Sequence, residues 1–243
     1  MLPSATETVW RFLSEQPVLT GFVLVGGSAL ALRIQHRRSE DLDFAFPGAQ
    51  LPRVRLDALM RLATAAGFEF QRNDDEAAVQ EFSAGGLELN DYQQNFLVNR
   101  AAKVSFFVPA EPLAKVLASA PEATVRVATL AELFKAKCLV SAVRSKTRDW
   151  LDLYLLMREH GFSIRDYQAS FREAGLETQC DIGLSRLCSG VPQRDDEGYA
   201  HLLENPPSLE EIKAFFRAQR DRLEIESAAE ESRKRPGGMA ENG

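Results

Sequence analysis

Residues 22–46 read FVLVGGSALALRIQHRRSEDLDFAF, and this stretch decides the fold. Its wholly apolar start, residues 22–25, is typical of a buried strand that ends at the pair Gly26-Gly27. Residues 28–35 then show a helical pattern, so the sequence predicts a strand, a tight turn and a helix. Because glycine lacks a Cβ atom, the backbone N–H groups of such a turn can approach a phosphate closely. Taken alone, the turn is also compatible with an ordinary connection capped by Ser28.

Two carboxylates follow at the end of the same stretch. Residues two apart on a strand face the same side, so Asp41 and Asp43 would project together while Leu42 and Phe44 turn into the core. Two carboxylates that close repel each other unless a cation lies between them, and Mg²⁺ prefers such oxygen ligands. The alternative is a solvated strand edge that carries two exposed aspartates.

The glycine turn and the carboxylate pair are expected to meet. Ser28 precedes Asp41 by 13 residues, and the intervening helix can return the chain so that the second strand lies beside the first. The turn would then hold a triphosphate and the carboxylates a metal ion at one end of the sheet. This arrangement is similar to the plan of nucleotidyltransferases of the DNA polymerase β superfamily.

Composition limits the class of protein. Hydrophobic residues make up 45% and charged residues 26% of the 243 residues, which argues against global disorder. The 29 Lys+Arg and 35 Asp+Glu give a formal charge of −6, which argues against nucleic-acid binding by bulk positive charge. A local basic patch stays compatible with this balance. No apolar stretch reaches the roughly 20 residues of a membrane span, and the start lacks a secretory pattern. We therefore expect a cytoplasmic protein with no membrane partner. Its three cysteines and three scattered histidines predict reduced thiols and no zinc site.

The pattern along the chain predicts an α+β fold. A nucleotidyltransferase-type mixed sheet flanked by helices is expected over residues 1–110, a mainly helical region that completes the site over 111–225, and a disordered tail over 226–243. Gly85-Gly86 marks a hairpin turn between two predicted strands. Further strands are expected at 69–72, 79–83, 87–90, 96–98 and 103–108, and helices at 6–15, 56–66, 130–143, 149–159, 164–174, 196–203 and 209–225.

Two blocks of sequence carry a closer resemblance. Residues 26–30 (GGSAL) and 36–44 (HRRSEDLDF) resemble the GG(S/T)AL…HRxSxDLDF signature of the AbiEii/AbiGii nucleotidyltransferase-like toxin family. Lys137, Arg144 and residues 148–154 (RDWLDLY) are similar to that family's downstream K…R…(K/R)DxxDLY segment. The resemblance spans roughly residues 20 to 158 and respects the order of the two blocks.

The resemblance implies a Mg²⁺- or Mn²⁺-dependent enzyme that transfers a nucleoside monophosphate from an NTP to an acceptor hydroxyl. RNA, such as a tRNA 3′ end, is the expected acceptor, and the protein would be the toxin of a toxin–antitoxin or abortive-infection system with a cognate antitoxin. It implies catalytic roles for Asp41, Asp43, Lys137 and Asp152, with the metal on Asp41 and Asp43, and nucleotide-binding roles for Gly26, Gly27, Ser28, Arg37, Ser39, Arg144 and Asp149.

The basic and acidic groups of these blocks also have plainer interpretations. Lys137 and Arg144 are seven residues apart and would share one helix face, and Asp149 and Asp152 would lie on nearby faces of the next helix. A surface salt-bridge network would use the same spacing. The run 36–38, with Arg33 one turn earlier, can contact phosphates or simply offset the acidic pair.

One position departs from the family pattern. Residues 102–107 read AKVSFF, with Ser105 where a third carboxylate is expected. Either Asp41 and Asp43 suffice, or another acid such as Glu88 takes the place, or the chain is a nucleotide- or partner-binding module with little transferase activity. Transfer to a protein or small-molecule acceptor is a further alternative.

Overall fold

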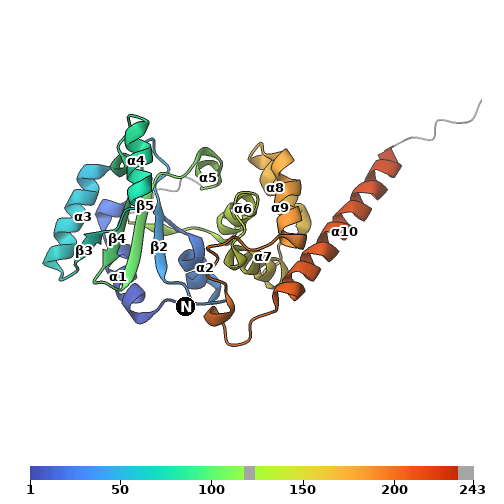
Figure 1. The fold of residues 1–243 in the computed structure, drawn as a ribbon, viewed down its shortest axis with the longest axis horizontal. Coiled ribbons are helices and arrows are strands. Elements are labelled where there is room, and N and C mark those ends of the chain that lie inside the picture. Colours follow the sequence, from blue (N-terminus) through green and yellow to red (C-terminus); the bar gives the residue numbers. More distant parts are fainter. Residues whose placement is uncertain (118–123, 235–243) are drawn as a thin grey trace, which may run out of the picture. The chain divides into compact units, whose positions relative to one another are not determined.

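The computed structural model describes residues 1–117 and 124–234 and shows an α+β fold (Figure 1). The strands are β1 (Val23–Val25), β2 (Asp41–Ala45), β3 (Phe70–Arg72), β4 (Gln93–Val98), β5 (Ala102–Phe107) and β6 (Arg126–Val127). The helices are α1 (Ser4–Ser14), α2 (Gly26–Ile34), α3 (Arg53–Ala65), α4 (Glu76–Ala84), α5 (Glu111–Val116), α6 (Leu130–Ser141), α7 (Thr147–Glu159), α8 (Ile164–Glu173), α9 (Glu177–Ser189) and α10 (Leu209–Lys234).

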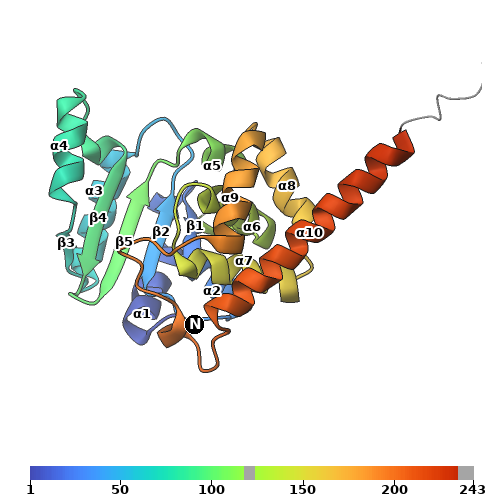
Figure 2. The same cartoon turned by 45° about the vertical axis from the view of Figure 1, so that its right-hand side comes forward.

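The strands form one mixed sheet in the order β3-β4-β5-β2-β1-β6. Figure 2 shows β3, β4, β5, β2 and β1 following one another across the sheet. β1 runs antiparallel to β2, while β2 runs parallel to β5 and β1 parallel to β6. The predicted mixed sheet is thus confirmed, and α2 returns the chain so that the carboxylate strand pairs with the strand before the glycines.

The two faces of the sheet differ in polarity. Leu42, Phe44 and Phe106 are fully buried on one face, where the rings of Phe44 and Phe106 stack with centroids 5.2 Å apart. Trp10 of α1 lies over Phe44 at 6.3 Å, so α1 covers this apolar face. The alternate residues of β2, Asp41 and Asp43, are only half-buried and share the opposite face, as the alternation predicts.

The chain divides into two compact units. The first comprises Met1–Ala136 with His201–Glu204, and the second comprises Lys137–Ala200 with the residues from Asn205 onward. The first unit extends past residue 110, where the sequence pattern placed the end of the sheet region. The reason is β6, whose pairing with β1 adds a sixth strand that a two-residue segment does not announce in the sequence.

Residues 79–90 were expected to form a hairpin, and that prediction is wrong. Residues 79–83 lie in α4, whose first turn is capped by the Asp75 side chain accepting from Ala77 N at 2.8 Å. Residues 89–91 form a 3₁₀ helix. The hairpin turn lies instead between β4 and β5, where Asn99 and Arg100 both have positive φ angles of 49° and 55°. Such angles at two successive residues are typical of a type I′ turn.

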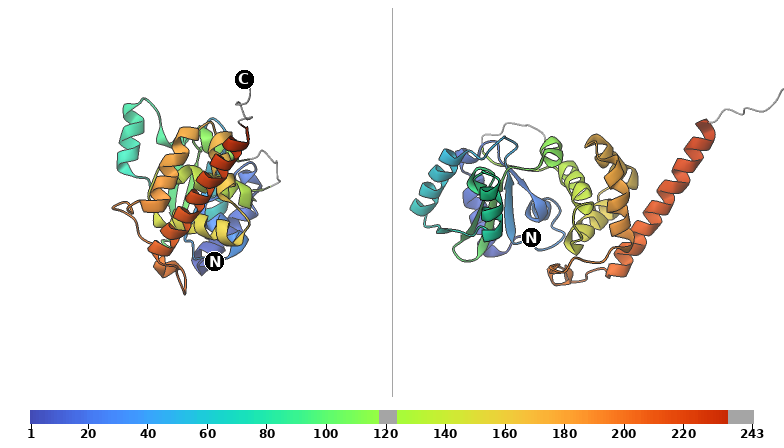
Figure 3. Two further views of the ribbon diagram at one scale, coloured as in Figure 1. Left: turned by 90° about the vertical axis from the view of Figure 1, so that its right-hand side faces the viewer. Right: turned by 45° about the horizontal axis from the view of Figure 1, so that its top comes forward.

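The second unit is helical in the residues that the structure describes (Figure 3). The helix predicted at 209–225 continues to Lys234, so residues 226–234 are not the irregular tail that was expected. Alanine and glutamate in this segment have high helix propensity. The i,i+4 ion pair between Arg222 and Glu226, at 2.8 Å, further stabilises the helix. α9 was missed because its apolar spacing is weak. The helix predicted at 196–203 is largely irregular, with a short 3₁₀ turn at Ala200–Leu202.

The helices and the cysteines bear on two further expectations from the sequence, concerning a membrane span and the state of the thiols. None of the helices in the described part of the chain combines the length and apolar character that a membrane span requires. Cys138, Cys180 and Cys188 are free and buried, and burial raises the pKa of the Cys180 thiol to about 11.

Candidate active site

The glycine turn lies directly against the carboxylate strand. Gly26 begins α2 with a φ of +73°, and a Cβ atom added to it would lie 2.9 Å from Asp43 Oδ2. This proximity follows from the register of the sheet, in which Val25 pairs with Asp43. The N-cap residue, Val25, makes no side-chain hydrogen bond to the first turn of α2. The backbone N–H groups at the positive end of the helix dipole lie beside the Asp43 carboxylate.

Arg37 and Ser39 reach the same turn from the loop that follows α2. A Cβ atom on Gly27 would lie 2.7 Å from Arg37 Nη2 and 2.8 Å from Ser39 Oγ. Both side chains are buried, and Arg37 Nη1 donates to the carbonyl of Arg38 at 2.8 Å. The structure thus brings Gly26, Gly27, Arg37, Ser39 and Asp43 close together.

Ser28 lies at this turn, but its hydroxyl is used inside the protein. The side chain is fully buried, and Oγ donates to the backbone carbonyl of Asp41 and lies 3.1 Å from Ser39 Oγ. The hydroxyl therefore ties α2 to the start of β2. A phosphate at this turn would be bound by backbone N–H groups rather than by this hydroxyl.

Asp41 and Asp43 present a donor set that suits a hard divalent cation. Both carboxylates lie half-buried on one face, and the Asp41 carboxylate has no hydrogen-bond or ion-pair partner within residues 1–117 and 124–234. No group of three or more His, Cys, Asp or Glu side chains is arranged to hold a metal in the same ranges. Two carboxylates on one face of a strand fit Mg²⁺, which keeps water and substrate phosphate as its remaining ligands.

The register places Ser105 beside Asp43. The two residues pair across β2 and β5, and Ser105 in turn pairs with Asn95 of β4. Serine thus stands where a third carboxylate would lie next to the pair. Glu88 does not replace it, because its carboxylate is 2.9 Å from Arg53 Nη1 and its side chain is 69% exposed.

The second unit holds the downstream residues in a buried ionic network. Lys137 Nζ lies 2.6 Å from Asp149 Oδ1 and 2.7 Å from Asp152 Oδ2, and Arg144 Nε lies 2.8 Å from Asp149 Oδ2. Burial works to raise the pKa of Asp149, but the charges of Lys137 and Arg144 outweigh it and lower that pKa. These ion pairs connect Lys137 of α6 and Arg144, which follows α6, to two aspartates of α7. The structure brings all four together, as the spacing predicts.

An acidic segment pairs with the basic turn before α7, which the sequence did not reveal. Asp196 accepts from Thr147 N at 3.1 Å and from Thr147 Oγ1 at 2.6 Å. Asp195 lies 3.4 Å from Lys146, and Glu197 lies 3.0 Å from Arg148. Opposite charge blocks at 145–148 and 194–197 are the one signal that could have suggested the pairing.

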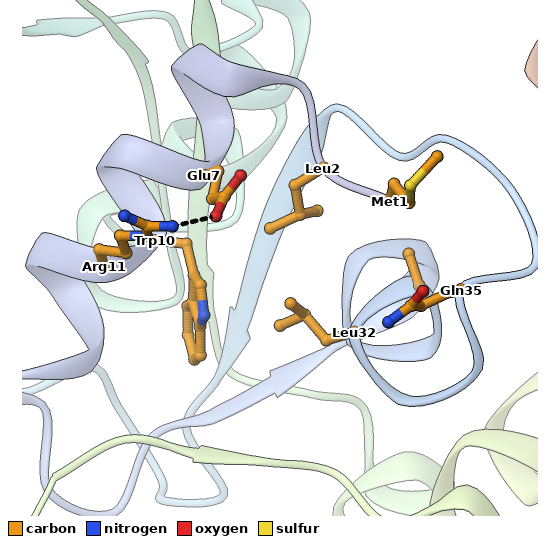
Figure 4. A pocket seen from close by; sticks show the side chains of 8 residues that line it. Met1, Leu2, Glu7, Trp10, Arg11, Leu32 and Gln35 are labelled. Carbon is orange, nitrogen blue, oxygen red and sulfur yellow. Dashed lines mark hydrogen bonds and ion pairs between the residues drawn. The ribbon is translucent and has the colours of Figure 1, made fainter.

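Two other features lie apart from the glycine turn. Arg33 donates to the carbonyls of Val127 and Ala128, both at 2.7 Å, so it braces β6 against α2. A hollow of about 370 Å³ opens between α1 and α2, where Trp10, Leu2 and Leu32 point toward one another (Figure 4). Its charged members, Glu7 and Arg11, pair with each other at 2.5 Å.

Comparisons with known proteins assign the chain to a family. An uncharacterized protein of Aquifex aeolicus (strain VF5) is 23% identical over 201 residues, covering 82% of this chain and 86% of its own. The nucleotidyltransferase toxin MenT4 of Mycobacterium tuberculosis H37Rv is 15% identical with a TM-score of 0.48, covering 93% of this chain and 94% of its own. A candidate nucleotidyltransferase from H. pylori is 18% identical with a TM-score of 0.48, covering 91% and 96%. The family model described as nucleotidyl transferase AbiEii toxin, type IV TA system, matches residues 9–237, and the chain belongs to this family of nucleotidyltransferase toxins.

Proposed function

We propose that the protein transfers a nucleoside monophosphate from an NTP to a hydroxyl of RNA, with the 3′ end of a tRNA as the preferred acceptor. The observation that carries the proposal is the convergence at the start of α2. The N-terminus of α2, the buried Arg37 guanidinium and the Asp43 carboxylate all meet at two glycines, where an added Cβ atom would lie within 3 Å of these side chains. Helix N–H groups and a guanidinium attract phosphate, and the two carboxylates of β2 are the kind of oxygen ligands with which Mg²⁺ binds substrate phosphates.

The chain's own residues divide the task. Backbone N–H groups of the glycine turn and Arg37 would bind the β- and γ-phosphates, and Ser28 would keep β2 in place through its bond to Asp41. A divalent cation on Asp41 and Asp43 would neutralise phosphate charge when bound. The acceptor oxygen then bonds to the α-phosphorus as the bond to the β-phosphate oxygen breaks and pyrophosphate leaves. With serine at position 105, the acceptor proton passes to Asp43 or to water.

For the second unit we propose that Lys137 and Asp152 contribute to transfer, and that Arg144 and Asp149 support them. The support for this is their place in the matched family segment, together with a buried network that fixes the lysine between two carboxylates. A cation held in a dry environment interacts strongly with developing phosphate charge. We also propose a cognate antitoxin as a partner, since the family is assigned to type IV toxin–antitoxin systems.

A second candidate function follows from Ser105. A module that binds nucleotide with little transfer would keep the glycine turn and Arg37 but lack a third acid beside Asp43. The two candidates differ in one measurable respect, because both predict NTP affinity and only the enzyme predicts turnover. A Ser105→Asp variant that gains activity from an inactive parent would favour the module.

The experiment is a transfer screen with each of four α-³²P-labelled NTPs, Mg²⁺, and either total RNA, protein or small-molecule hydroxyls as acceptor. The proposal expects label in the RNA fraction from the wild type. NTP affinity is measured in parallel by calorimetry, so that a module is recognised by binding without transfer. Label found only in protein would contradict the proposed acceptor, and label in no fraction would contradict the enzyme.

A further inference from the structure

A polar strip continues from the carboxylate pair onto the next two strands. Asp41 pairs with Lys103 of β5, Asp43 pairs with Ser105, and Ser105 pairs with Asn95 of β4. Residues paired across neighbouring strands point to the same face of the sheet. The burial pattern agrees, because Lys103 is exposed and Ser105 and Asn95 are half-buried, whereas the alternate Val104 and Phe106 are buried. We define Lys103, Ser105 and Asn95 as the β5–β4 strip.

The strip and the glycine turn lie on opposite sides of β2. The strand order β4-β5-β2-β1 puts β1, which leads into Gly26, on one side of the carboxylate strand and β5 on the other. Asp41 and Asp43 therefore separate the proposed triphosphate site from the strip. Adjacent strands are about 5 Å apart, so the strip begins within one strand spacing of the carboxylates.

The in-line geometry of the transfer reaction determines the side of β2 from which the acceptor approaches. The attacking oxygen and the leaving oxygen lie roughly opposite each other across the phosphorus. If the glycine turn holds the leaving phosphates, as in the proposed function on which this step rests, the acceptor approaches from the β5 side. We infer that the β5–β4 strip is the surface on which the RNA acceptor lies, with Lys103 binding a phosphate of its backbone.

The chemistry of the strip suits a nucleic-acid end. The Lys103 ammonium group has no hydrogen-bond or ion-pair partner within the ranges that the structure describes, so its charge is available to a phosphate. The Ser105 hydroxyl is likewise unpaired in those ranges and can bond to a sugar hydroxyl. A carboxylate at position 105 would offset the Lys103 charge and repel an incoming phosphate. Serine at this position therefore favours a polyanionic acceptor.

The far end of the strip is held in place. Asn95 Nδ2 lies 3.3 Å from Asp74 Oδ1, and Asn95 Oδ1 accepts from Gln93 Nε2 at 3.2 Å. The Asn95 backbone N–H also donates to Asp74 Oδ1 at 2.9 Å. These bonds fix the Asn95 amide beside Ser105 in one orientation, so this end of the strip presents polar groups at defined positions.

The test compares Lys103→Ala with Arg61→Ala. Arg61 is an exposed cation on α3 of the same unit and has no partner in the described ranges, so its loss controls for net charge. Lys103→Ala should raise the KM for RNA severalfold, leave NTP affinity unchanged, and reduce the salt dependence of RNA binding by about one phosphate contact, a slope change of about 0.7. Arg61→Ala should change none of these.

A readout without turnover keeps this inference separate from the proposed function. Binding of a 5′-fluorescein-labelled single-stranded RNA with a free 3′ hydroxyl is measured by anisotropy without NTP or metal. Weaker RNA binding by Lys103→Ala supports the strip even if no transfer is found. Unchanged RNA affinity and RNA KM, or a loss of NTP affinity instead, would overturn it.

Discussion

Gly26 and Asp43 are in such close contact that a Cβ atom on the glycine would lie 2.9 Å from the carboxylate oxygen Oδ2. The contact joins the two motifs of the opening sequence stretch and fixes the distance between the proposed phosphate site and the proposed metal ligand. A substitution at Gly26 therefore affects both the backbone, because of its positive φ angle, and the position of Asp43.

Gly26→Ala should abolish most transfer activity. Alanine at a φ of +73° costs about 1–2 kcal/mol, and its methyl group would in addition push Asp43 away. Gly86→Ala is the matched control, because its φ is +72° and a Cβ atom there meets nothing within 4 Å. Urea unfolding should show the cost of the positive φ angle in both variants and a further loss in Gly26→Ala from the contact with Asp43, and transfer assays should show a loss only for Gly26→Ala. Equal activities would mean that the contact with Asp43 is irrelevant to the reaction.

Ser28→Ala should lower kcat while leaving NTP affinity near the wild-type value. The variant loses a buried hydroxyl that bonds to the Asp41 carbonyl, at a cost of about 1 kcal/mol in unfolding free energy, and β2 is held less firmly. Gly27→Ala should behave differently, because its methyl group would displace Arg37 and Ser39 from the turn and weaken NTP binding. Calorimetry and steady-state kinetics separate the two outcomes. Loss of NTP affinity with unchanged kcat in Ser28→Ala would assign the hydroxyl to the phosphate instead.

Lys137→Met should destabilise the second unit by about 3–5 kcal/mol at neutral pH, because it strands two buried carboxylates. The pKa of Asp149 is lowered in the folded protein, so its stabilising contribution is present above its unfolded pKa of about 4 and is lost as pH falls through the folded value. Without Lys137, burial raises the pKa of the stranded acids, so the variant takes up protons at higher pH than the wild type does. The difference in unfolding free energy between wild type and variant should therefore narrow as pH falls from neutral through about 4.

The check on this network is urea unfolding over a pH series, with Arg144→Ala as the control. The Arg144 side chain is 48% exposed, so solvent screens its ion pair and its loss should cost about 1 kcal/mol or less. A pH-independent gap for Lys137→Met would show that the cost comes from packing rather than from charge.

The sequence predicts the parts of the fold that rest on local pattern. The alternation of Asp41, Leu42, Asp43 and Phe44 predicts β2 and its two faces, and the glycine pair predicts the turn into α2. Residues 79–90 mislead, because a short apolar run before Gly85-Gly86 suits a hairpin as well as a helix capped by Asp75. β6 depends on pairing with β1, a contact that no local pattern encodes.

The candidate site also combines features that the local sequence predicts with features that depend on distant contacts. The spacing predicts that the glycine turn and the carboxylate pair meet, and the family resemblance adds Arg37 and Ser39, whereas the use of each group depends on contacts between distant residues. Ser28 bonds to a carbonyl 13 residues away, and Asp196 caps a helix whose first residue is Thr147. The β5–β4 strip likewise requires the register of three strands, which fixes Lys103 beside Asp41.

The most direct test of the central claim is transfer of α-³²P label from NTP to RNA by wild type and Asp43→Asn, with Asp57→Asn as an exposed carboxylate control on α3. The amide keeps the shape of Asp43 but removes the charge that would hold a divalent cation. We expect label in RNA with wild type and Asp57→Asn, and none above background with Asp43→Asn. Equal labelling by all three proteins would contradict the assignment of Asp43 to the active site.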